Sequence, residues 1–277
     1  MPSFIDTHAH YFDRRFDDLD GGADDILSDP AFWRATRAVI NVGTNPRTNR
    51  LAVEQAAAYP RMVAAVGIHP EDAQGLPDGD ALDPADELIG LLAYLSDPVT
   101  RAEDKIVAIG EIGLDYHWQP MDKRLQMAFF EGQLEIARDT GLPVIIHDRE
   151  AHGDCFDTVL RYPTVRGVFH GYSGSAEMAR ELTRRGWYIA FGGAATFKNA
   201  ERVRGVVASV DPDHLLLETD CPYMAPVPYR GRINRSDYIP AVAEVVAPLV
   251  GLTVETLSER TTANAERLFG ISRFVRL

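Results

Sequence analysis

The stretch Phe4-Ile5-Asp6-Thr7-His8-Ala9-His10 opens the chain, and the rest of the sequence is best interpreted from it. Phe4 and Ile5 favour a β-strand, and side chains at positions i and i+2 of a strand point to the same face. His8 and His10 can therefore aim two imidazoles at one point, as two ligands of one metal ion must be aimed. Alone, such a pair is more often two ordinary surface or capping histidines than a metal site, so its meaning depends on the later segments.

Short apolar segments alternate with longer amphipathic ones along the chain. The short segments are nearly continuous in Val, Ile, Leu and Ala, as expected for parallel strands covered by helices. The predicted strands are Phe4–His8, Ala38–Val42, Met62–Ile68, Ile106–Gly110, Val144–His147, Gly167–His170, Tyr188–Phe191 and Leu215–Glu218. The predicted helices are Thr48–Tyr59, Pro84–Leu95, Met121–Thr140, Ala151–Tyr162, Ser175–Arg185, Ala200–Val210, Asp237–Val250 and Val254–Phe269.

This alternation predicts an α/β fold, a (β/α)8 TIM barrel. The alternative is an open, doubly wound sheet, but the glycine-rich dinucleotide fingerprint is absent after the first predicted strand. Because the sequence has no repeat, low-complexity tract or linker, residues 1–277 are expected to form a single domain.

Composition limits the classes of partner. The chain has 28 Lys and Arg against 41 Asp and Glu, a net charge of −13, so its surface does not attract nucleic acid by bulk electrostatics. A phosphodiester substrate would need bound cations and a few local arginines. Cys155 and Cys221 make no disulfide framework, no apolar run reaches transmembrane length, and cleavage of a signal peptide would remove His8 and His10. We therefore expect a cytoplasmic protein without a membrane segment or an obligate protein partner.

The segment Tyr11–Ala35 is longer than a usual connection between a strand and a helix. It is rich in aspartate and contains Gly21-Gly22. A calcium loop is conceivable, but the spacing of the acids fits no such loop. We expect a solvated excursion over the mouth of the barrel.

Polar residues close most of the predicted strands. They are His69 after the third strand, Glu111 after the fourth, His147 after the fifth, His170 after the sixth and Asp220 after the eighth. One histidine at a strand end is usually a buried core residue or a helix cap, but five strands ending this way are hard to explain so. The carboxyl ends of barrel strands are where catalytic residues collect. Buried together without a cation, these carboxylates would repel one another.

The charges of these residues suggest two metal ions. Four histidines supply neutral nitrogen donors, and two carboxylates supply negative charge: His8, His10, His147, His170, Glu111 and Asp220. Six ligands with one bridging carboxylate fit two divalent ions about 3.5–4 Å apart. Glu111 is the candidate bridge. Asp220 is a ligand that could also take the proton from an attacking water, so Glu111 and Asp220 are the predicted catalytic residues.

These residues resemble those of the TatD-like metal-dependent hydrolases of the amidohydrolase superfamily, over nearly the whole chain. The matching stretches are residues 6–10, 67–70, 110–116, 147–149, 170–174, 218–222 and 262–270. The resemblance implies a barrel with a one- or two-metal centre, one ion held by His8, His10, Glu111 and Asp220 and the other by Glu111, His147 and His170. It also implies metal-dependent deoxyribonuclease activity, including 3′→5′ exonuclease action, on DNA or a small phosphodiester.

The substrate-binding residues are predicted from their charge and position. Arg149 lies two residues after a predicted ligand, and a guanidinium suits phosphate, although a salt bridge at the rim is an equal alternative. His69 is interpreted as lining the site or as a core histidine. After the last strand the family often has Arg-Gly-Lys-Arg-Asn-Glu-Pro, whereas this chain reads Arg230–Ser236, which keeps Arg230 and has Arg232 in place of Lys. Asp6 and Glu218 are expected to support the ligands or to cap structure.

Two other functions stay open at this point. The same ions could activate water against an amide, ester or lactone. A catalytically silent metal-binding protein is the second alternative, against which the retained Asp220 argues. The metals are expected to be Zn²⁺, Mn²⁺, Mg²⁺ or Co²⁺, because the site is rich in histidine while phosphoryl chemistry often uses Mg²⁺.

Overall fold

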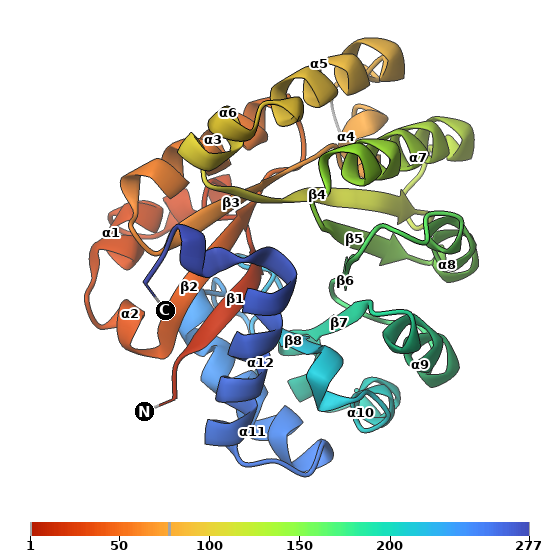
Figure 1. Cartoon of the computed structure of the whole chain (residues 1–277). Helices are drawn as coiled ribbons and strands as arrows, with labels where there is room; N and C mark the ends of the chain where they lie inside the picture. The colour runs from red at the N-terminus through yellow and green to blue at the C-terminus, as the bar shows by residue number, and fades with distance from the viewer. Residues whose placement is uncertain (1, 77–78, 277) are drawn as a thin grey trace.

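Eight parallel strands form one sheet in a computed structural model that describes residues 2–76 and 79–276. The strands are β1 (Phe4–Ala9), β2 (Thr36–Val42), β3 (Met62–Val66), β4 (Ile106–Asp115), β5 (Val144–Arg149), β6 (Gly167–Phe169), β7 (Tyr188–Phe191) and β8 (Leu215–Leu217). They are ordered β1 to β8, and a parallel bridge between Ala9 and Cys221 joins the two edges. The predicted (β/α)8 barrel is therefore confirmed (Figure 1).

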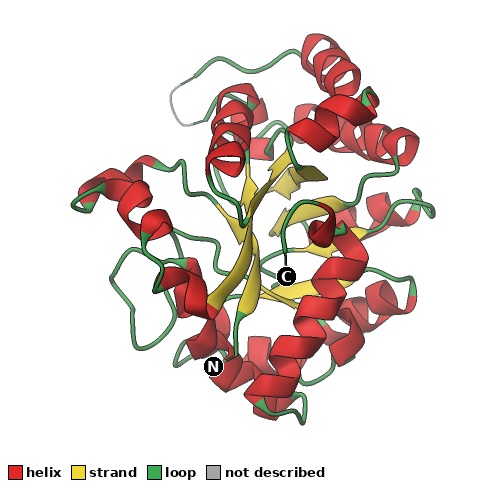
Figure 2. Cartoon of the chain, turned by 60° about the vertical axis from the view of Figure 1, so that its left-hand side comes forward, coloured by secondary structure: helices red, strands yellow, loops and turns green. Residues whose placement is uncertain are grey.

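Helices surround the strands on the outside (Figure 2). They are α1 (Gly22–Ser28), α2 (Phe32–Ala35), α3 (Pro46–Ala58), α4 (Pro70–Ala73), α5 (Pro84–Ser96), α6 (Pro98–Glu103), α7 (Lys123–Thr140), α8 (His152–Leu160), α9 (Ala176–Arg184), α10 (Glu201–Val207), α11 (Ile239–Leu249) and α12 (Val254–Phe269). The short 3-10 turns are η1 (Arg14–Asp18), η2 (Gly193–Thr196), η3 (Pro212–His214), η4 (Ser236–Tyr238) and η5 (Ile271–Arg273). The short helices α1, α2, α4 and α6 were not predicted, because segments of four to seven residues carry too little periodicity.

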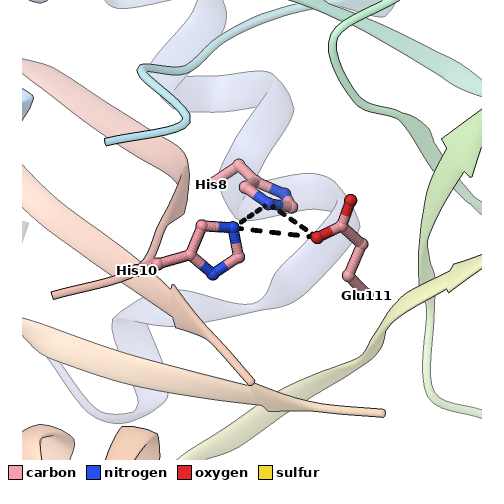
Figure 3. A group of neighbouring side chains, drawn as sticks. All are labelled: His8, His10 and Glu111. Atoms are coloured by element: carbon pink, nitrogen blue, oxygen red, sulfur yellow. Dashed lines mark hydrogen bonds and ion pairs between the residues drawn. The ribbon is translucent and has the colours of Figure 1, made fainter. Parts of the chain in front are cut away.

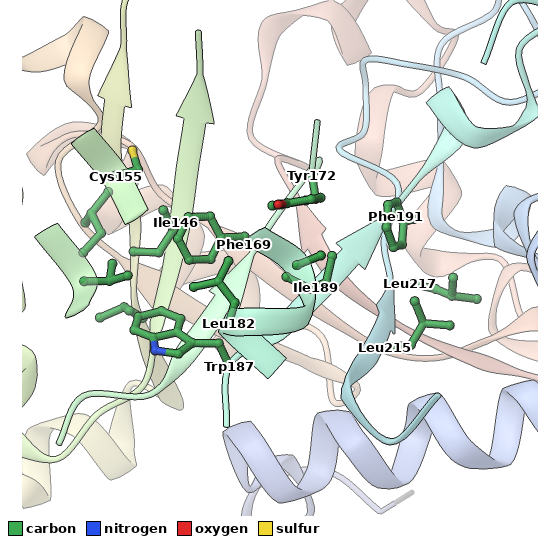
Figure 4. Close-up of a cluster of buried hydrophobic side chains, with 14 of the residues drawn as sticks. Ile146, Cys155, Phe169, Tyr172, Leu182, Trp187, Ile189, Phe191, Leu215 and Leu217 are labelled. Carbon is green, nitrogen blue, oxygen red and sulfur yellow. The ribbon is translucent and has the colours of Figure 1, made fainter. Parts of the chain in front are cut away.

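Alternating strand residues divide the core into two layers. Side chains such as Ile146, Phe169, Ile189 and Leu217 face outward and pack against the helices (Figure 4). The alternate residues face inward and form a second cluster. The strand residues of this second cluster are Ile5, Ala38, Ile40, Val42, Val63, Ala65, Val107, Ala108, Ile145, Val168, Tyr188, Ala190 and Leu216. Val107 and Ala108 are consecutive because the register between β3 and β4 shifts there. The interior is thus a packed core, as expected of a barrel of this size.

The same alternation carries polar residues into the mouth of the barrel. Ile145 and Val168 face inward, and two residues later along the same strand directions come His147 and His170. Since side chains repeat with a period of two, these histidines point to the barrel axis above the apolar layer.

Helix α12 covers the opposite end of the barrel, beside the first residues of β1 and β8. Its Ala265 and Phe269 belong to the inward cluster, and the Asn264 Nδ2 donates to the carbonyl of Leu215 at 2.8 Å. Among the residues that the structure describes, no single helix is long and apolar enough to cross a membrane, and one bent pair, Ser236–Leu249 with Val254–Phe269, passes on length and composition alone.

The segment from Tyr11 to Ala35 corrects one prediction. It contains η1, α1 and α2, and five of its apolar side chains are buried against the barrel: Tyr11, Phe16, Ile26, Leu27 and Phe32. Most of its acidic side chains and its arginines are exposed, so the description as a solvated excursion is wrong for its apolar half. Four residues of this segment, Phe12 to Arg15, also line a cleft at the carboxyl ends of the strands.

Candidate metal centre

Glu111 lies at the centre of the site and is 4% exposed. It lies within β4, which continues to Asp115 and so extends beyond the predicted end at Gly110. Its Oε2 is 3.4 Å from Nε2 of His8 and 3.7 Å from Nε2 of His10. Its other oxygen, Oε1, is 2.7 Å from Nδ1 of His147 and 2.7 Å from Nε2 of His170. The two oxygens of this carboxylate thus face two separate histidine pairs. Figure 3 shows the pair formed by His8 and His10.

The orientation of His10 fixes which of its nitrogens is free to bind. Its Nδ1 lies 2.7 Å from the carbonyl oxygen of Val42, an acceptor, so Nδ1 carries the proton and Nε2 a lone pair. That Nε2 lies 3.0 Å from Nε2 of His8 and 3.5 Å from Oδ1 of Asp220. In the neutral ring, the lone pair on His10 Nε2 therefore faces two carboxylate oxygens, one of Glu111 and one of Asp220, and no fixed hydrogen-bond donor lies between them. Such a group of acceptors is the chemistry that a bound cation satisfies, and the residues therefore fit a metal ion.

Asp220 reaches the site from the loop after β8 with a backbone φ of 57°. Aspartate tolerates this left-handed conformation better than most residues. The backbone around it is held by two hydrogen bonds, from the Asp220 N–H to the His8 carbonyl and from the Tyr223 N–H to the Asp220 carbonyl, both 2.9 Å. Its side chain is 28% exposed against 5% for Glu111, so Asp220 is the carboxylate open to the cleft.

Asp115 is a site residue for which the sequence analysis proposed no role. It is 1% exposed, and its Oδ2 lies 3.0 Å from Nε2 of His147, whose other nitrogen faces Glu111. A carboxylate at the far nitrogen of a ligand histidine fixes the tautomer and the ring orientation. Asp115 follows Glu111 by four positions on β4. That even spacing was the available signal, because it puts both side chains on one face of a strand.

Asp6 and Glu218 support the segments that carry the ligands. Asp6 accepts from the backbone N–H groups of His8 at 3.2 Å and Thr219 at 3.0 Å, which ties β1 to the residue before Asp220. Glu218 Oε1 accepts from the Gly171 N–H at 2.6 Å and lies 3.6 Å from Nδ1 of His170. Neither carboxylate needs to touch a metal ion in order to position those that do.

The pKa shifts show that the carboxylates and histidines of the site interact strongly by charge and by hydrogen bonds. Burial raises the pKa of Glu111, but the charge of His170 and the hydrogen bond with His147 outweigh burial and hold this pKa well below its ordinary value. Burial lowers the pKa of His147, yet Asp115 and Glu111 raise it to about 9. Without a metal ion, protons on the histidines thus offset the carboxylate charge. A bound cation would replace those protons.

Three groups of histidine and acidic residues could each hold a metal ion within the described ranges. They are His8 with His10 and Glu111, His8 with His170 and Asp220, and His69 with Glu111 and His147. The six residues predicted as ligands therefore lie together in one place.

His69 belongs to one of these groups but is oriented as a donor. Its Nδ1 accepts from the Glu71 N–H at 3.2 Å, so in a neutral ring the proton sits on Nε2. That Nε2 lies 3.6 Å from Oε1 of Glu111. Burial and the neighbouring His147 lower the pKa of His69 to about 3, which keeps the ring neutral. His69 thus presents an N–H to the cleft rather than a lone pair to a metal ion.

A cleft of about 770 Å³ lies over these residues, large enough for a small ligand or for part of a larger one. Its lining includes His10, His69, Glu111, His147, His170 and Asp220, and four arginines: Arg14, Arg15, Arg47 and Arg149. Of the arginines predicted to bind substrate, Arg149 is in the lining, whereas Arg230 and Arg232 are not.

The residues of the Arg230–Ser236 stretch make other contacts. The guanidinium of Arg230 lies 4.0 Å from the centre of the Phe197 ring, and Arg235 pairs with Asp237 at 2.9 Å. The buried Asn234 donates from Nδ2 to the carbonyls of Thr219 at 2.8 Å and Tyr223 at 2.7 Å. In this chain the stretch holds the Asp220 loop in place.

Comparisons with known proteins agree with this geometry. A family model described as TatD related DNase matches residues 5–270. The chain is 39% identical over 272 residues to YabD of Bacillus subtilis and 36% identical over 270 residues to YcfH of Escherichia coli K12, both called uncharacterized metal-dependent hydrolases. These matches cover 97% and 96% of this chain, and 99% and 96% of the relatives. The crystal structure of the TatD homologue YjjV of Escherichia coli K12 superimposes with a TM-score of 0.84 at 29% identity, covering 96% of this chain and 98% of that one.

Proposed function

The chain belongs to the TatD related DNase family of metal-dependent hydrolases, and on that premise we propose that it is a deoxyribonuclease of the 3′→5′ exonuclease type with a centre of two divalent ions. One observation carries the proposal. The two oxygens of the buried Glu111 face different histidine pairs, His8 with His10 and His147 with His170. A carboxylate that serves one ion has no need of this arrangement, whereas it is the one expected of a carboxylate that would bridge two ions through its two oxygens.

The ligands divide between the two positions by their distances to Glu111. His8, His10 and Asp220 would hold one ion with Oε2, and His147 and His170 would hold the other with Oε1. Two divalent ions in such a centre lower the pKa of water and stabilise the charge that develops on a phosphoryl oxygen. The mixed set of nitrogen and oxygen donors suits Zn²⁺, Mn²⁺ or Co²⁺, with Mg²⁺ as a further candidate.

Asp220 is the proposed proton acceptor. Burial raises its pKa, but the neighbouring histidines, His10 and His170 among them, outweigh burial and lower the pKa below the ordinary value. The carboxylate is therefore ionised at neutral pH. Its side chain is the more exposed of the two ligand carboxylates, so it can take a proton from a water molecule in the cleft and release it to solvent.

Two groups of the chain are proposed to hold the phosphate. His69 offers the Nε2–H that faces Glu111, and Arg149 lines the cleft two residues after His147. A neutral N–H donor and a guanidinium both stabilise negative charge as it builds up on the phosphoryl oxygens. In the Michaelis complex they would orient the scissile bond towards the Asp220 side of the centre.

The test compares substrates under controlled metal content. Protein purified without chelator is assayed on a single-stranded oligodeoxynucleotide, an aryl phosphodiester, and a panel of esters and lactones. Each assay is repeated after EDTA treatment and after addition of Mn²⁺, Zn²⁺, Co²⁺ or Mg²⁺. The proposal expects metal-dependent shortening of the oligonucleotide from its 3′ end. Turnover confined to esters or lactones would show that the same centre acts on carbonyl compounds rather than on phosphodiesters.

A silent metal-binding protein predicts a different result from the same panel. It would bind the ions tightly but turn over none of the substrates. A variant Glu111→Gln serves as the control for contaminating nucleases, because it changes one atom of one buried side chain. Activity that survives in Glu111→Gln comes from a contaminant or refutes the role of Glu111.

A further inference from the structure

The four arginines of the cleft are unevenly distributed around the barrel mouth. Arg14 and Arg15 follow β1, and Arg47 follows β2, so three of the four lie on one side. Arg149 ends β5, which is four strands away from β1 in a closed barrel of eight and therefore on the opposite side. All four side chains are exposed, and within the described residues none of them pairs with a carboxylate at ion-pair distance. Asp13, Glu71 and Asp72 also line the cleft, but none of them lies within ion-pair distance of these guanidinium groups, which can therefore turn to a bound anion.

We define the arginine wall as Arg14, Arg15 and Arg47, and one of its three side chains, Arg15, is anchored by an aromatic ring. The Arg15 guanidinium lies 4.4 Å from the centre of the Tyr223 ring, and the Tyr223 hydroxyl donates to Oδ2 of Asp13 at 2.6 Å. Stacking on an aromatic ring restrains a guanidinium and leaves its N–H groups free at the edge. Arg15 is therefore held over the Asp220 side of the cleft, ready to bind phosphate.

The opposite wall has a different character. Trp118 lines it and is 47% exposed, and the Arg149 guanidinium lies 5.3 Å from the centre of its ring. A large exposed aromatic side chain in a cleft is a surface on which a nucleobase can stack. One wall is thus suited to several phosphates, and the other to one phosphate and a flat ring.

We propose that this asymmetry sets the direction of the bound strand: the phosphates upstream of the scissile bond lie along Arg14, Arg15 and Arg47, and the 3′-terminal base stacks on Trp118. A strand that is cut from its 3′ end has further phosphates only on the upstream side, which matches the wall with three arginines. The inference rests on the proposed function and specifies its substrate as a single-stranded polynucleotide with at least one phosphate beyond the scissile one.

Substrates of increasing length test the arginine wall. A dinucleoside monophosphate has only the scissile phosphate, whereas a trinucleotide and a tetranucleotide add one and two upstream phosphates. The parent protein is expected to gain about tenfold in kcat/KM from the dinucleotide to the tetranucleotide, the size of a charge-assisted contact or two. Arg15→Ala and Arg47→Ala should lose most of that gain through KM, with little change on the dinucleotide, and Arg15→Lys should keep part of it.

Salt dependence gives a readout that a merely structural role would not change. The logarithm of kcat/KM for the tetranucleotide falls linearly with the logarithm of salt concentration, and each phosphate contact removed should reduce that slope by about 0.7 for a single strand. The matched control is Arg273→Ala, another exposed arginine beside an aromatic ring, Phe274, in the turn η5 far from the cleft. It should leave both the length dependence and the slope unchanged.

The Trp118 wall is tested with Trp118→Ala and Trp118→Phe on strands whose 3′-terminal residue carries a base or is abasic. Loss of the ring should cost about tenfold on the normal strand and little on the abasic one, and phenylalanine should restore most of the loss.

Two results would contradict the proposed direction of the strand. Arg15→Ala and Arg47→Ala could behave like Arg273→Ala at every substrate length, or they could lower activity on the dinucleotide as much as on the tetranucleotide. A parent protein that shortens oligonucleotides without any dependence on length overturns this inference alone. One that attacks no oligonucleotide overturns the proposed function with it.

Discussion

The floor and the rim of the cleft are built in different ways. On the floor, His10, Glu111 and His147 lie on strands or directly after them, and each has partners that fix its orientation. On the rim, Arg15 and Arg149 are exposed and lie beside aromatic rings. The floor is rigid because strand geometry and buried hydrogen bonds leave no alternative, while the rim is shaped by loops. Chemistry is expected to depend on the floor and substrate choice on the rim.

The largest effect is expected from the floor. Glu111→Gln keeps the shape of the side chain but removes the charge that faces both histidine pairs, so kcat/KM should fall by at least about a thousandfold. The far-UV circular dichroism spectrum should not change, because the barrel does not depend on this charge. Activity within tenfold of the parent would mean that the floor is not organised around Glu111.

Asp220→Asn should produce the next largest loss. The amide cannot accept a proton at neutral pH, so kcat should fall by about 10²- to 10⁴-fold, the usual range for a general base. Asp220 can exchange this proton with solvent because its side chain is 28% exposed, whereas that of Glu111 is 5% exposed. The measurement is kcat at saturating substrate and metal, with bound metal verified by elemental analysis. A change confined to KM would instead make Asp220 a binding residue.

The pH dependence of metal binding tests the electrostatics of the floor. The pKa of His147 is raised to about 9 by Asp115 and Glu111 against the effect of burial. Burial lowers the pKa of His170, but Glu111 and Glu218 outweigh burial and raise this pKa well above its ordinary value as well. Below pH 9 both rings hold protons that metal ions must displace, so affinity should rise by at least about tenfold per pH unit from about pH 7 to 9. Competition titrations of metal-free protein at three pH values measure it. A metal affinity that does not change over this pH range would contradict the displacement of histidine protons by the metal.

Asp115→Asn should have an intermediate effect, since Asp115 acts through His147. Loss of its carboxylate is expected to weaken metal binding at pH 9 by about 10- to 100-fold, the usual effect of removing an outer partner of a ligand histidine. The conservative control is Asp115→Glu, which keeps the charge and should recover part of the affinity. Equal loss in Asp115→Glu and Asp115→Asn would point to packing rather than to the hydrogen bond.

The two regions also differ in how far the sequence predicts them. The strands, the barrel and the residues that close the strands follow from local rules: apolar segments of four to seven residues, and side chains that repeat with a period of two. The resemblance to the family was confirmed by the comparisons. Asp115 was available from the same even spacing on β4, but it was assigned no role.

The rim did not follow from such rules. Arg230 and Arg232 were predicted to bind substrate because they follow the last strand, yet they lie outside the lining of the cleft. Arg14 and Arg15 reach it because the turn η1 packs through the buried Phe16 against the barrel. That packing joins residues far apart in sequence, such as Asp13 and Tyr223, and no local pattern encodes it.

The smallest effect on catalysis is expected at the end of the barrel away from the cleft. Phe269 on α12 is 1% exposed within the inward apolar cluster. Phe269→Ala should lower the free energy of unfolding by about 3–5 kcal/mol while leaving the specific activity of folded, metal-loaded protein within about twofold of the parent. Urea denaturation and steady-state kinetics separate the two quantities. A large loss of kcat in the folded variant would show that the two ends of the barrel are coupled.

The most direct test of the bridging role of Glu111 is the number of metal ions bound by the parent and by Glu111→Gln. Metal-free protein is titrated with Mn²⁺ by calorimetry, and the loaded protein is checked by elemental analysis. The account predicts two ions per chain in the parent and no more than one at the same metal concentration in Glu111→Gln. One ion per chain in the parent, or two in both proteins, would contradict it.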